Sequence, residues 1–192
     1  MTTATSTMSS GIRICVFCSA NNHIDPEYFA LAEELGRWIG HHGHTLVYGG
    51  HDEGLMECIA RATHEAGGVV EGVIPRCLVD SGHLSKYVDV EILCETLSDR
   101  KDIMLGRSDA VVAMPGGIGT LDEVFTVAAS ATLSYHHLRV VMYNMKGFWS
   151  PLEHLMDALQ EKGMIRGDYH RQLIFAKKLD EIVAALPSST HE

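Results

Sequence analysis

DAVVAMPGGIGTLDEVF, residues 109–125, is the most informative stretch of this 192-residue chain. Residues 109–114 form a largely apolar run of strand length, which ends at Pro115 and two glycines, and an amphipathic helix is expected to begin near Thr120. A strand that leads through a glycine-rich turn into a helix favours anion binding, because unpaired backbone N–H groups and the helix dipole point at one spot. The glycines lack Cβ atoms and allow close approach to the main chain. The stretch therefore predicts an anion-binding site formed by Gly116, Gly117, Gly119 and Thr120.

Glu123 lies one helical turn beyond the glycine loop, and its role has two interpretations. A carboxylate beside a bound phosphate indicates chemistry on a phosphorylated molecule. Thr120-x-x-Glu123 also fits a capping box, in which the glutamate only accepts a hydrogen bond from the N-cap backbone N–H. The motif by itself leaves both interpretations open.

Composition limits the class of protein. A chain of 192 residues with 46% hydrophobic content predicts one domain, expected at residues 11–187 between disordered tails at 1–10 and 188–192. No apolar stretch approaches the roughly 20 residues that span a bilayer, and the N-terminus lacks the features of a signal peptide. We therefore expect a cytoplasmic protein without a membrane partner. The formal net charge of −10 argues against a nucleic-acid polymer as partner.

The cysteines and histidines do not indicate a metal site. The five cysteines are odd in number and scattered, which is typical of reduced thiols. Cys15 and Cys18 have the spacing of a redox or zinc motif, but they fall at an apolar strand pattern in which residues three apart point to opposite faces. We interpret them as buried thiols. His64 lacks a second histidine at the spacing of a zinc-binding helix, so we expect no metal.

Strand and helix patterns alternate along the whole chain. Strands are expected at about 12–18, 45–48, 69–74, 88–92, 109–114, 139–143 and 173–175, and helices at about 26–40, 54–66, 97–107, 120–133, 150–162 and 178–186. Short connections between them predict a single-domain, Rossmann-like α/β fold, a doubly wound parallel sheet with helices on both faces. Ligands bind such sheets at the carboxyl ends of the strands, near the switch in strand order. That rule selects the loops at 18–22, 48–56 and 115–119.

These loops exclude two common nucleotide-binding classes. No Gly-x-Gly-x-x-Gly follows the first strand, and the chain contains no Gly-Lys-Ser/Thr P-loop. NAD-dependent enzymes and ATPases are therefore disfavoured.

Arg100 and Lys101 stand in the first turn of the helix that precedes the glycine loop, with Thr96 or Ser98 as the expected cap. Two cations there oppose the helix dipole, at a cost of roughly 0.3–1 kcal/mol each when exposed. A solvated basic pair offset by neighbouring acids is one interpretation. We favour the other, in which Arg100 points into the ligand cleft, because a guanidinium suits anions.

Several segments, in order and spacing, resemble the LONELY GUY (LOG) family of cytokinin riboside 5′-monophosphate phosphoribohydrolases, which are often mislabelled as lysine decarboxylases. Residues 115–123 fit the family motif Pro-Gly-Gly-x-Gly-Thr-x-x-Glu, and Arg100-Lys101 with Met104 stands where the family has its Arg-Lys pair. Residues 14–18, 47–56 and 72–75 are similar too. The resemblance covers about residues 11–187.

The resemblance implies an enzyme without metal or cofactor that cleaves the N-glycosidic bond of a nucleoside 5′-monophosphate, such as a cytokinin riboside 5′-monophosphate or AMP. The products would be the free base and ribose 5-phosphate. Arg100 and Glu123 would be the catalytic pair, and the substrate would be bound by Gly116, Gly117, Gly119, Thr120, Lys101, Met104, Ser19, Gly49 and Gly50. The resemblance implies a dimer or larger assembly, and the apolar residues on more than one face of helix 121–133 also favour an interface, so we expect a homodimer.

The chain departs from the family pattern in several places. His51 replaces a glycine and is followed by Asp52 and Glu53, Glu57 replaces another glycine, and Ser130-Ala-Thr132 stands where the family has Trp-x-Gln. We therefore expect the chemistry to be retained with a changed base preference. Two alternatives stay open: a non-catalytic nucleotide or molybdenum-cofactor carrier, and a lysine decarboxylase with Lys101 as its pyridoxal-phosphate lysine.

Overall fold

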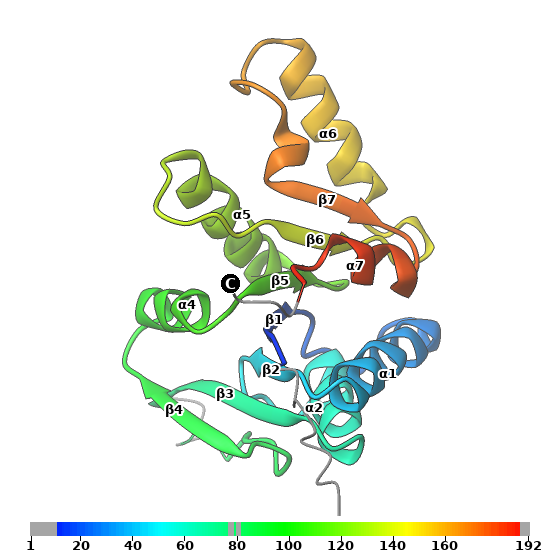
Figure 1. Ribbon diagram of the computed structural model, residues 1–192, viewed down its shortest axis with the longest axis vertical. Coiled ribbons are helices and arrows are strands. Elements are labelled where there is room, and N and C mark those ends of the chain that lie inside the picture. Colours follow the sequence, from blue (N-terminus) through cyan, green and yellow to red (C-terminus); the bar gives the residue numbers. More distant parts are fainter. Residues whose placement is uncertain (1–10, 77–78, 80–81, 189–192) are drawn as a thin grey trace, which may run out of the picture.

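The computed structural model describes residues 11–76, 79 and 82–188, and its centre is a seven-stranded sheet in the order β4-β3-β2-β1-β5-β6-β7 (Figure 1). Every pair of neighbouring strands is parallel. The strands are β1 (Arg13–Phe17), β2 (Thr45–Tyr48), β3 (Val69–Pro75), β4 (Val90–Cys94), β5 (Ala110–Ala113), β6 (Val140–Tyr143) and β7 (Leu173–Ala176). The parallel sheet predicted from the sequence is confirmed.

Helices cover both faces of this sheet, as expected for a doubly wound fold (Figure 1). The helices are α1 (Pro26–His41), α2 (Gly54–Glu65), α4 (Leu97–Gly106), α5 (Ile118–Thr132), α6 (Ser150–Glu161) and α7 (Leu179–Ala185), with short 3₁₀ turns η1 (Met145–Gly147) and η2 (Tyr169–Arg171). Leu35, Leu55 and Ile182 of α1, α2 and α7 share one core. Met104 of α4 and Val124 of α5 belong to the core on the opposite face.

The two cores explain the Cys15-x-x-Cys18 spacing. Successive side chains of a strand alternate between faces, and Cys15 lies in one core while Cys18 lies in the other. Both thiols are buried, and burial raises the pKa of each well above its ordinary value. The interpretation as buried thiols is confirmed.

Each helix and strand predicted from the sequence is present within two residues of its expected bounds. One difference matters for function: α5 begins at Ile118 and not near Thr120. The tails predicted at 1–10 and 188–192 lie outside the described residues, apart from Ser188. Within the part of the chain that the structure describes, no helix is long and apolar enough to cross a membrane.

The strand order reverses between β1 and β5. The chain proceeds from β1 outward to β4 on one side of the sheet and from β5 outward to β7 on the other. The loops that follow β1 and β5 therefore leave the sheet side by side, and the N–H of Ser19 donates to the carbonyl of Pro115 at 3.1 Å. This switch point is where open α/β sheets bind their ligands.

Candidate active site

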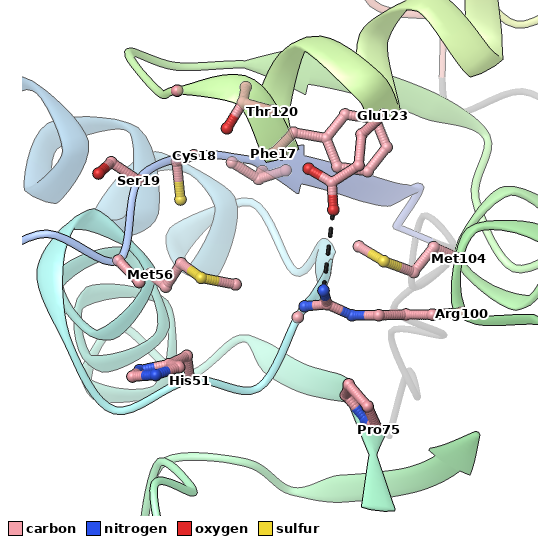
Figure 2. Close-up of a pocket in the computed structure, with 15 residues that line it drawn as sticks. Phe17, Cys18, Ser19, His51, Met56, Pro75, Arg100, Met104, Thr120 and Glu123 are labelled. Atoms are coloured by element: carbon pink, nitrogen blue, oxygen red, sulfur yellow. Dashed lines mark ion pairs between the residues drawn. The ribbon is translucent and has the colours of Figure 1, made fainter. Parts of the chain in front are cut away.

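A cavity of about 330 Å³ opens at the carboxyl ends of β1, β2, β3 and β5 (Figure 2). Most of the predicted site residues line it: Arg100, Glu123, Gly117, Gly119, Thr120, Met104, Ser19 and Gly49. Three loops that are far apart in the sequence thus meet at the switch point. The volume falls within the range of small-molecule sites, about 300–1,000 Å³.

The glycine loop ends in the open N-terminus of α5. Gly117 is the N-cap residue, and no side chain caps this end of the helix. Thr120 is therefore the third residue of the helix and not its cap, so the capping-box interpretation of Thr120-x-x-Glu123 is wrong. The reason is that the helix begins two residues earlier than the apolar periodicity indicates. The first N–H groups of α5 stay available for a ligand.

The three glycines of this loop have different structural roles. A Cβ on Gly116 would lie 2.1 Å from Oγ1 of Thr120, so this glycine makes room for the buried threonine. A Cβ on Gly117 or Gly119 would meet no protein atom within 4 Å. Packing within the chain therefore does not demand glycine at these two positions, and the space beside their backbone is open to the cavity.

Arg100 is directed into the cavity by the way α4 begins. Thr96 caps α4 in a capping box with Asp99, which confirms one of the two expected caps. One turn into the helix, Nε of Arg100 donates to the carbonyl of Val73 at 3.1 Å. The guanidinium lies against Gly49, where a Cβ would come within 1.6 Å of Nη2. The structure thus places Arg100 in the cavity and not on a solvated helix face.

Glu123 faces Arg100 across the cavity (Figure 2). Nη1 of Arg100 lies 3.9 Å from Oε1 of Glu123, and each side chain is 15% exposed. This distance is too long for a hydrogen bond. Burial is the main influence on the carboxyl and raises its pKa to about 7, opposed by Arg100 and Lys101 and assisted by Asp122. Glu123 therefore changes its protonation state near neutral pH.

Lys101, Gly50 and Gly116 were predicted to bind substrate but lie outside the set of lining residues. Nζ of Lys101 donates to Oδ2 of Asp122 at 2.8 Å and to Oγ1 of Thr126 at 3.0 Å, so the ammonium group is held against α5. Gly50 has a φ of +80°, a conformation that favours glycine. These residues support the elements that form the site and do not line the cavity themselves.

Ser19 helps to fix the loop that follows β1. Its carbonyl accepts a hydrogen bond from the N–H of Leu55 at 2.9 Å, and Oδ1 of Asn22 accepts one from the N–H of Gly54 at 2.8 Å. A Cβ on Gly54 would lie 2.4 Å from the carbonyl carbon of Ala20. The start of α2 and the loop after β1 are thus packed against each other, which gives this wall of the cavity a defined shape.

The remaining lining residues were not named as site residues from the sequence. They are mostly apolar: Val16, Phe17, Cys18, Ala20, His51, Met56 and Pro75. Cys18, Ala20, His51 and Met56 lie in the loops that the rule on the carboxyl ends of strands selected. Val16, Phe17 and Pro75 belong to the strands themselves, in segments that carry the family resemblance. Ser130 and Thr132, where the family has Trp-x-Gln, do not line the cavity. They lie near the C-terminal end of α5 and so do not shape the cavity within one chain.

Comparison with known proteins gives the family. A family model described as "possible lysine decarboxylase" matches residues 56–186. A probable cytokinin riboside 5′-monophosphate phosphoribohydrolase of Oryza sativa subsp. japonica is 35% identical over 182 residues, covering 94% of this chain and 75% of that protein. A cytokinin riboside 5′-monophosphate phosphoribohydrolase of Arabidopsis thaliana is 34% identical over 174 residues, covering 91% and 76%. The chain belongs to the LOG family.

Solved structures extend the comparison beyond named LOG proteins. The molybdenum-cofactor carrier protein of Chlamydomonas reinhardtii superposes with a TM-score of 0.69 at 26% identity, covering 91% of this chain and 94% of that one. A molybdenum-cofactor binding protein of Rippkaea orientalis shares the fold, with a TM-score of 0.67 at 20% identity and the same coverage. The fold of this chain is therefore shared with proteins named as molybdenum-cofactor carriers or binding proteins. The fold alone does not separate hydrolysis from carrier function, and the residues of the site must do so.

Proposed function

We propose that this protein hydrolyses the N-glycosidic bond of a nucleoside 5′-monophosphate, releasing the free base and ribose 5-phosphate. The observation that carries the proposal is the pairing of Arg100 and Glu123 in one cavity with the uncapped N-terminus of α5. An anion site and a carboxyl group that titrates near neutral pH fit a phosphorylated substrate with a bond to break. The relatives named as phosphoribohydrolases support this function.

The phosphate of the substrate would bind at the start of α5. Backbone N–H groups of the first turn are unpaired, and the space beside Gly117 and Gly119 is open. Thr120 lines the same end of the cavity and can donate its hydroxyl proton. Because Glu123 follows one turn later on the same helix, a phosphate held at the N-terminus would place the attached ribose near the carboxyl group. Binding of the remote phosphate would then hold the reacting bond in position.

Glu123 and Arg100 would carry the chemistry. Cleavage of an N-glycoside develops positive charge on the sugar, which an ionised Glu123 stabilises. The oxygen of a water molecule bonds to C1′, and one proton of that water passes to the Glu123 carboxylate. The base leaves with the electron pair of the C1′–N bond and takes up the proton that Glu123 releases. A carboxyl group with a pKa of about 7 can accept that proton and release it again at neutral pH. Arg100 would steady the departing base or the ribose hydroxyl groups.

A base-release assay tests the proposal directly. Purified protein is incubated with AMP, isopentenyladenosine monophosphate, CMP or GMP, and free base and ribose 5-phosphate are measured. We expect equal amounts of the two products. We also expect a base preference other than isopentenyladenine, because His51 lines the cavity where the family has glycine. Release of isopentenyladenine far faster than of any other base would contradict the changed preference.

Two substitutions test the assigned roles. Glu123→Gln and Arg100→Ala should each lower kcat by at least about 100-fold, in the range of general acid–base and electrostatic contributions. Asp122→Asn is a matched control, because Asp122 is adjacent on α5 but points to Lys101 and does not line the cavity. Its loss should lower the pKa of Glu123 and leave kcat at the pH optimum unchanged. Full activity in Glu123→Gln would refute the catalytic role of this residue.

A carrier function is the alternative that the structural comparison favours, given the likeness to the carrier of Chlamydomonas reinhardtii. A carrier would bind a phosphorylated ligand in a fixed ratio without releasing base. A lysine decarboxylase is disfavoured, because no lysine lines the cavity among the described residues and Lys101 is held by Asp122 and Thr126. Stable binding of nucleotide without release of base would select the carrier.

We infer that the protein forms a homodimer through the outer face of α5. Val124 and Val127 of this helix are buried in the core. On its outer side Ile118 is 88% exposed, and Phe125 and the C-cap residue Leu133 are exposed as well. Such an exposed apolar face indicates an interface. Light scattering after gel filtration should give a dimer for the native chain. Phe125→Asp should give a monomer, whereas Val90→Asp on the edge strand β4 should leave the dimer intact.

Buried thiols support a proposal for the compartment. The side chains of Cys15, Cys18 and Cys58 are buried and form no disulfide. Reduced thiols are typical of cytoplasmic proteins, and we infer a cytoplasmic location.

A further inference from the structure

Two histidines and an aspartate meet at the edge of the cavity. Nδ1 of His51 lies 3.4 Å from Oδ1 of Asp52, and Nδ1 of His83 lies 3.3 Å from the same oxygen. The two imidazole rings are stacked, with centroids 5.4 Å apart and planes at 12°. His51 also lines the cavity, and Figure 2 shows it next to Met56, on the side away from Thr120. This cluster is separate from the Arg100–Glu123 pair, and metal binding by it has no part in the proposed cleavage step.

Backbone contacts hold the cluster together. His51 directly follows the Gly-Gly turn after β2, and Asp52 is its neighbour in the chain. His83 lies between β3 and β4, next to Leu84, which forms an antiparallel bridge with His51. The N–H of Ser85 donates a hydrogen bond to the carbonyl of Gly50 at 3.0 Å. His83 is 32 residues from His51 in the sequence, and ligand spacing along the chain therefore does not reveal the cluster.

The polar atoms of this cluster lack a sufficient set of hydrogen bonds. Nδ1 of His51 is shielded from solvent and has no hydrogen-bond partner. A buried polar atom without a partner destabilises a fold, so a ligand at this atom would remove that penalty. The oxygen of Asp52 is approached by both rings at distances longer than a good hydrogen bond. The rings are thus arranged around the carboxylate without being firmly bonded to it.

The distances fit a metal ion better than hydrogen bonds. In a tetrahedral zinc site with bonds of about 2.0–2.1 Å to nitrogen and oxygen, two ligand atoms lie roughly 3.3–3.4 Å apart. The two nitrogen–oxygen distances in the cluster have these values. All three ligand atoms lie within 4.8 Å of one another, and the exposed side chain of His83 can rotate to complete the geometry.

We propose that His51, Asp52 and His83 bind a divalent transition-metal ion, with Zn²⁺ preferred. Two imidazoles and one carboxylate are ligands that zinc accepts. With three protein ligands the site keeps an open position for water or for a donor atom of a ligand in the cavity, because His51 belongs to both. The sequence lacks the usual zinc-ligand spacing, and we therefore expected no metal. The structure assigns this site because the tertiary fold joins the second and third strand connections.

The test measures metal binding and no catalytic activity, so it stands apart from the proposed hydrolysis. Untagged protein is freed of metal with a chelator and titrated with Zn²⁺ against a chromogenic chelator, and Co²⁺ is added separately to record the absorption of its coordination sphere. We expect one Zn²⁺ per chain with a dissociation constant below about 10 μM, equivalent to roughly −7 kcal/mol. Co²⁺ should give the intense visible bands of a four-coordinate site.

Two histidine variants make the test specific. Loss of a residue that merely supports a metal ligand weakens binding by about 10–100-fold, so His83→Ala should weaken Zn²⁺ binding by at least about 100-fold. His170→Ala is the matched control, because His170 is exposed and pairs with a single carboxylate, Asp168, at 2.8 Å. Equal melting temperatures of the metal-free proteins would show that both variants fold.

The expected outcome is one strong site in the native chain and in His170→Ala, and its loss in His83→Ala. Zn²⁺ should also raise the melting temperature of the first two proteins by mass action and leave that of His83→Ala unchanged. Absence of a strong site in the native chain would overturn the proposal. Equal affinity of His83→Ala and His170→Ala would overturn it as well.

Discussion

Replacing Glu123 by glutamine should stabilise the fold at pH 8 and leave its stability almost unchanged near pH 5. The carboxyl group is nearly isosteric with the amide, so packing in the cavity is retained. What changes is the charge: burial disfavours the ionised carboxylate and raises its pKa from the ordinary 4.5 to about 7, even though Arg100 attracts it. The native chain therefore keeps a buried charge above pH 7 that glutamine does not have.

The magnitude follows from the pKa in the folded and unfolded states. Between pH 4.5 and pH 7 the folded chain holds a proton on Glu123 that the unfolded chain has lost, so stability falls as the pH rises. With about 1.4 kcal/mol for each pKa unit, the accumulated loss is about 3 kcal/mol at pH 8 and under about 1 kcal/mol at pH 5. Glu123→Gln should recover this free energy. For a chain of this size, about 3 kcal/mol corresponds to roughly 6–12 °C in melting temperature.

The assay is urea unfolding of native chain and variant at pH 5 and pH 8, with base release measured on the same samples. Glu123→Gln should be the more stable protein at pH 8 and the inactive one there. At pH 5 the native chain should also lose most of its activity, because Glu123 is then protonated. Asp122→Asn is the control, because Asp122 is 56% exposed and its pair with Lys101 contributes at most about 1 kcal/mol. A destabilised Glu123→Gln, or a gain of equal size at both pH values, would refute the reasoning that a buried carboxylate strains the fold.

Two further predictions concern the surroundings of this pair. Gly49→Ala should displace the guanidinium of Arg100 and lower kcat/KM by about 10-fold or more, with little change in melting temperature because the clash is with a flexible side chain. Gly106→Ala, where a Cβ meets nothing within 4 Å, is its control, and equal activity of the two variants would contradict the prediction. Lys101→Met should move the rising limb of the pH–rate profile to higher pH, since the ammonium group lowers the pKa of Glu123. A profile that stays in place or moves to lower pH would show that Lys101 does not act on this carboxyl.

Much of the fold was predictable from local patterns. Apolar runs separated by amphipathic stretches placed every strand and helix within two residues of its observed bounds. The short connections then required parallel strands and helices on both faces. The glycine loop after β5 was recognisable as well, because Pro115 and the glycines end a strand directly before a helix.

The start of α5 shows where local patterns are not sufficient. Periodicity placed the first turn at Thr120, because Ile118 and Gly119 do not contribute to an amphipathic pattern. In the structure the helix begins at Ile118, with Ile118 exposed and Gly117 as the cap. This difference of two residues excludes the capping-box interpretation of Glu123.

The sequence by itself determined the order of elements, the parallel sheet and the loops that meet at its carboxyl edge, because these depend on periodicity and on the geometry of short connections. Only the tertiary structure decided how the side chains at that edge are arranged. The direction of Arg100 depends on Gly49 and Val73, and the pKa of Glu123 depends on burial by other elements. The approach of His83 to His51 depends on a bridge between two loops. Burial and distance between remote residues are properties of the folded chain, and they govern charge and metal binding.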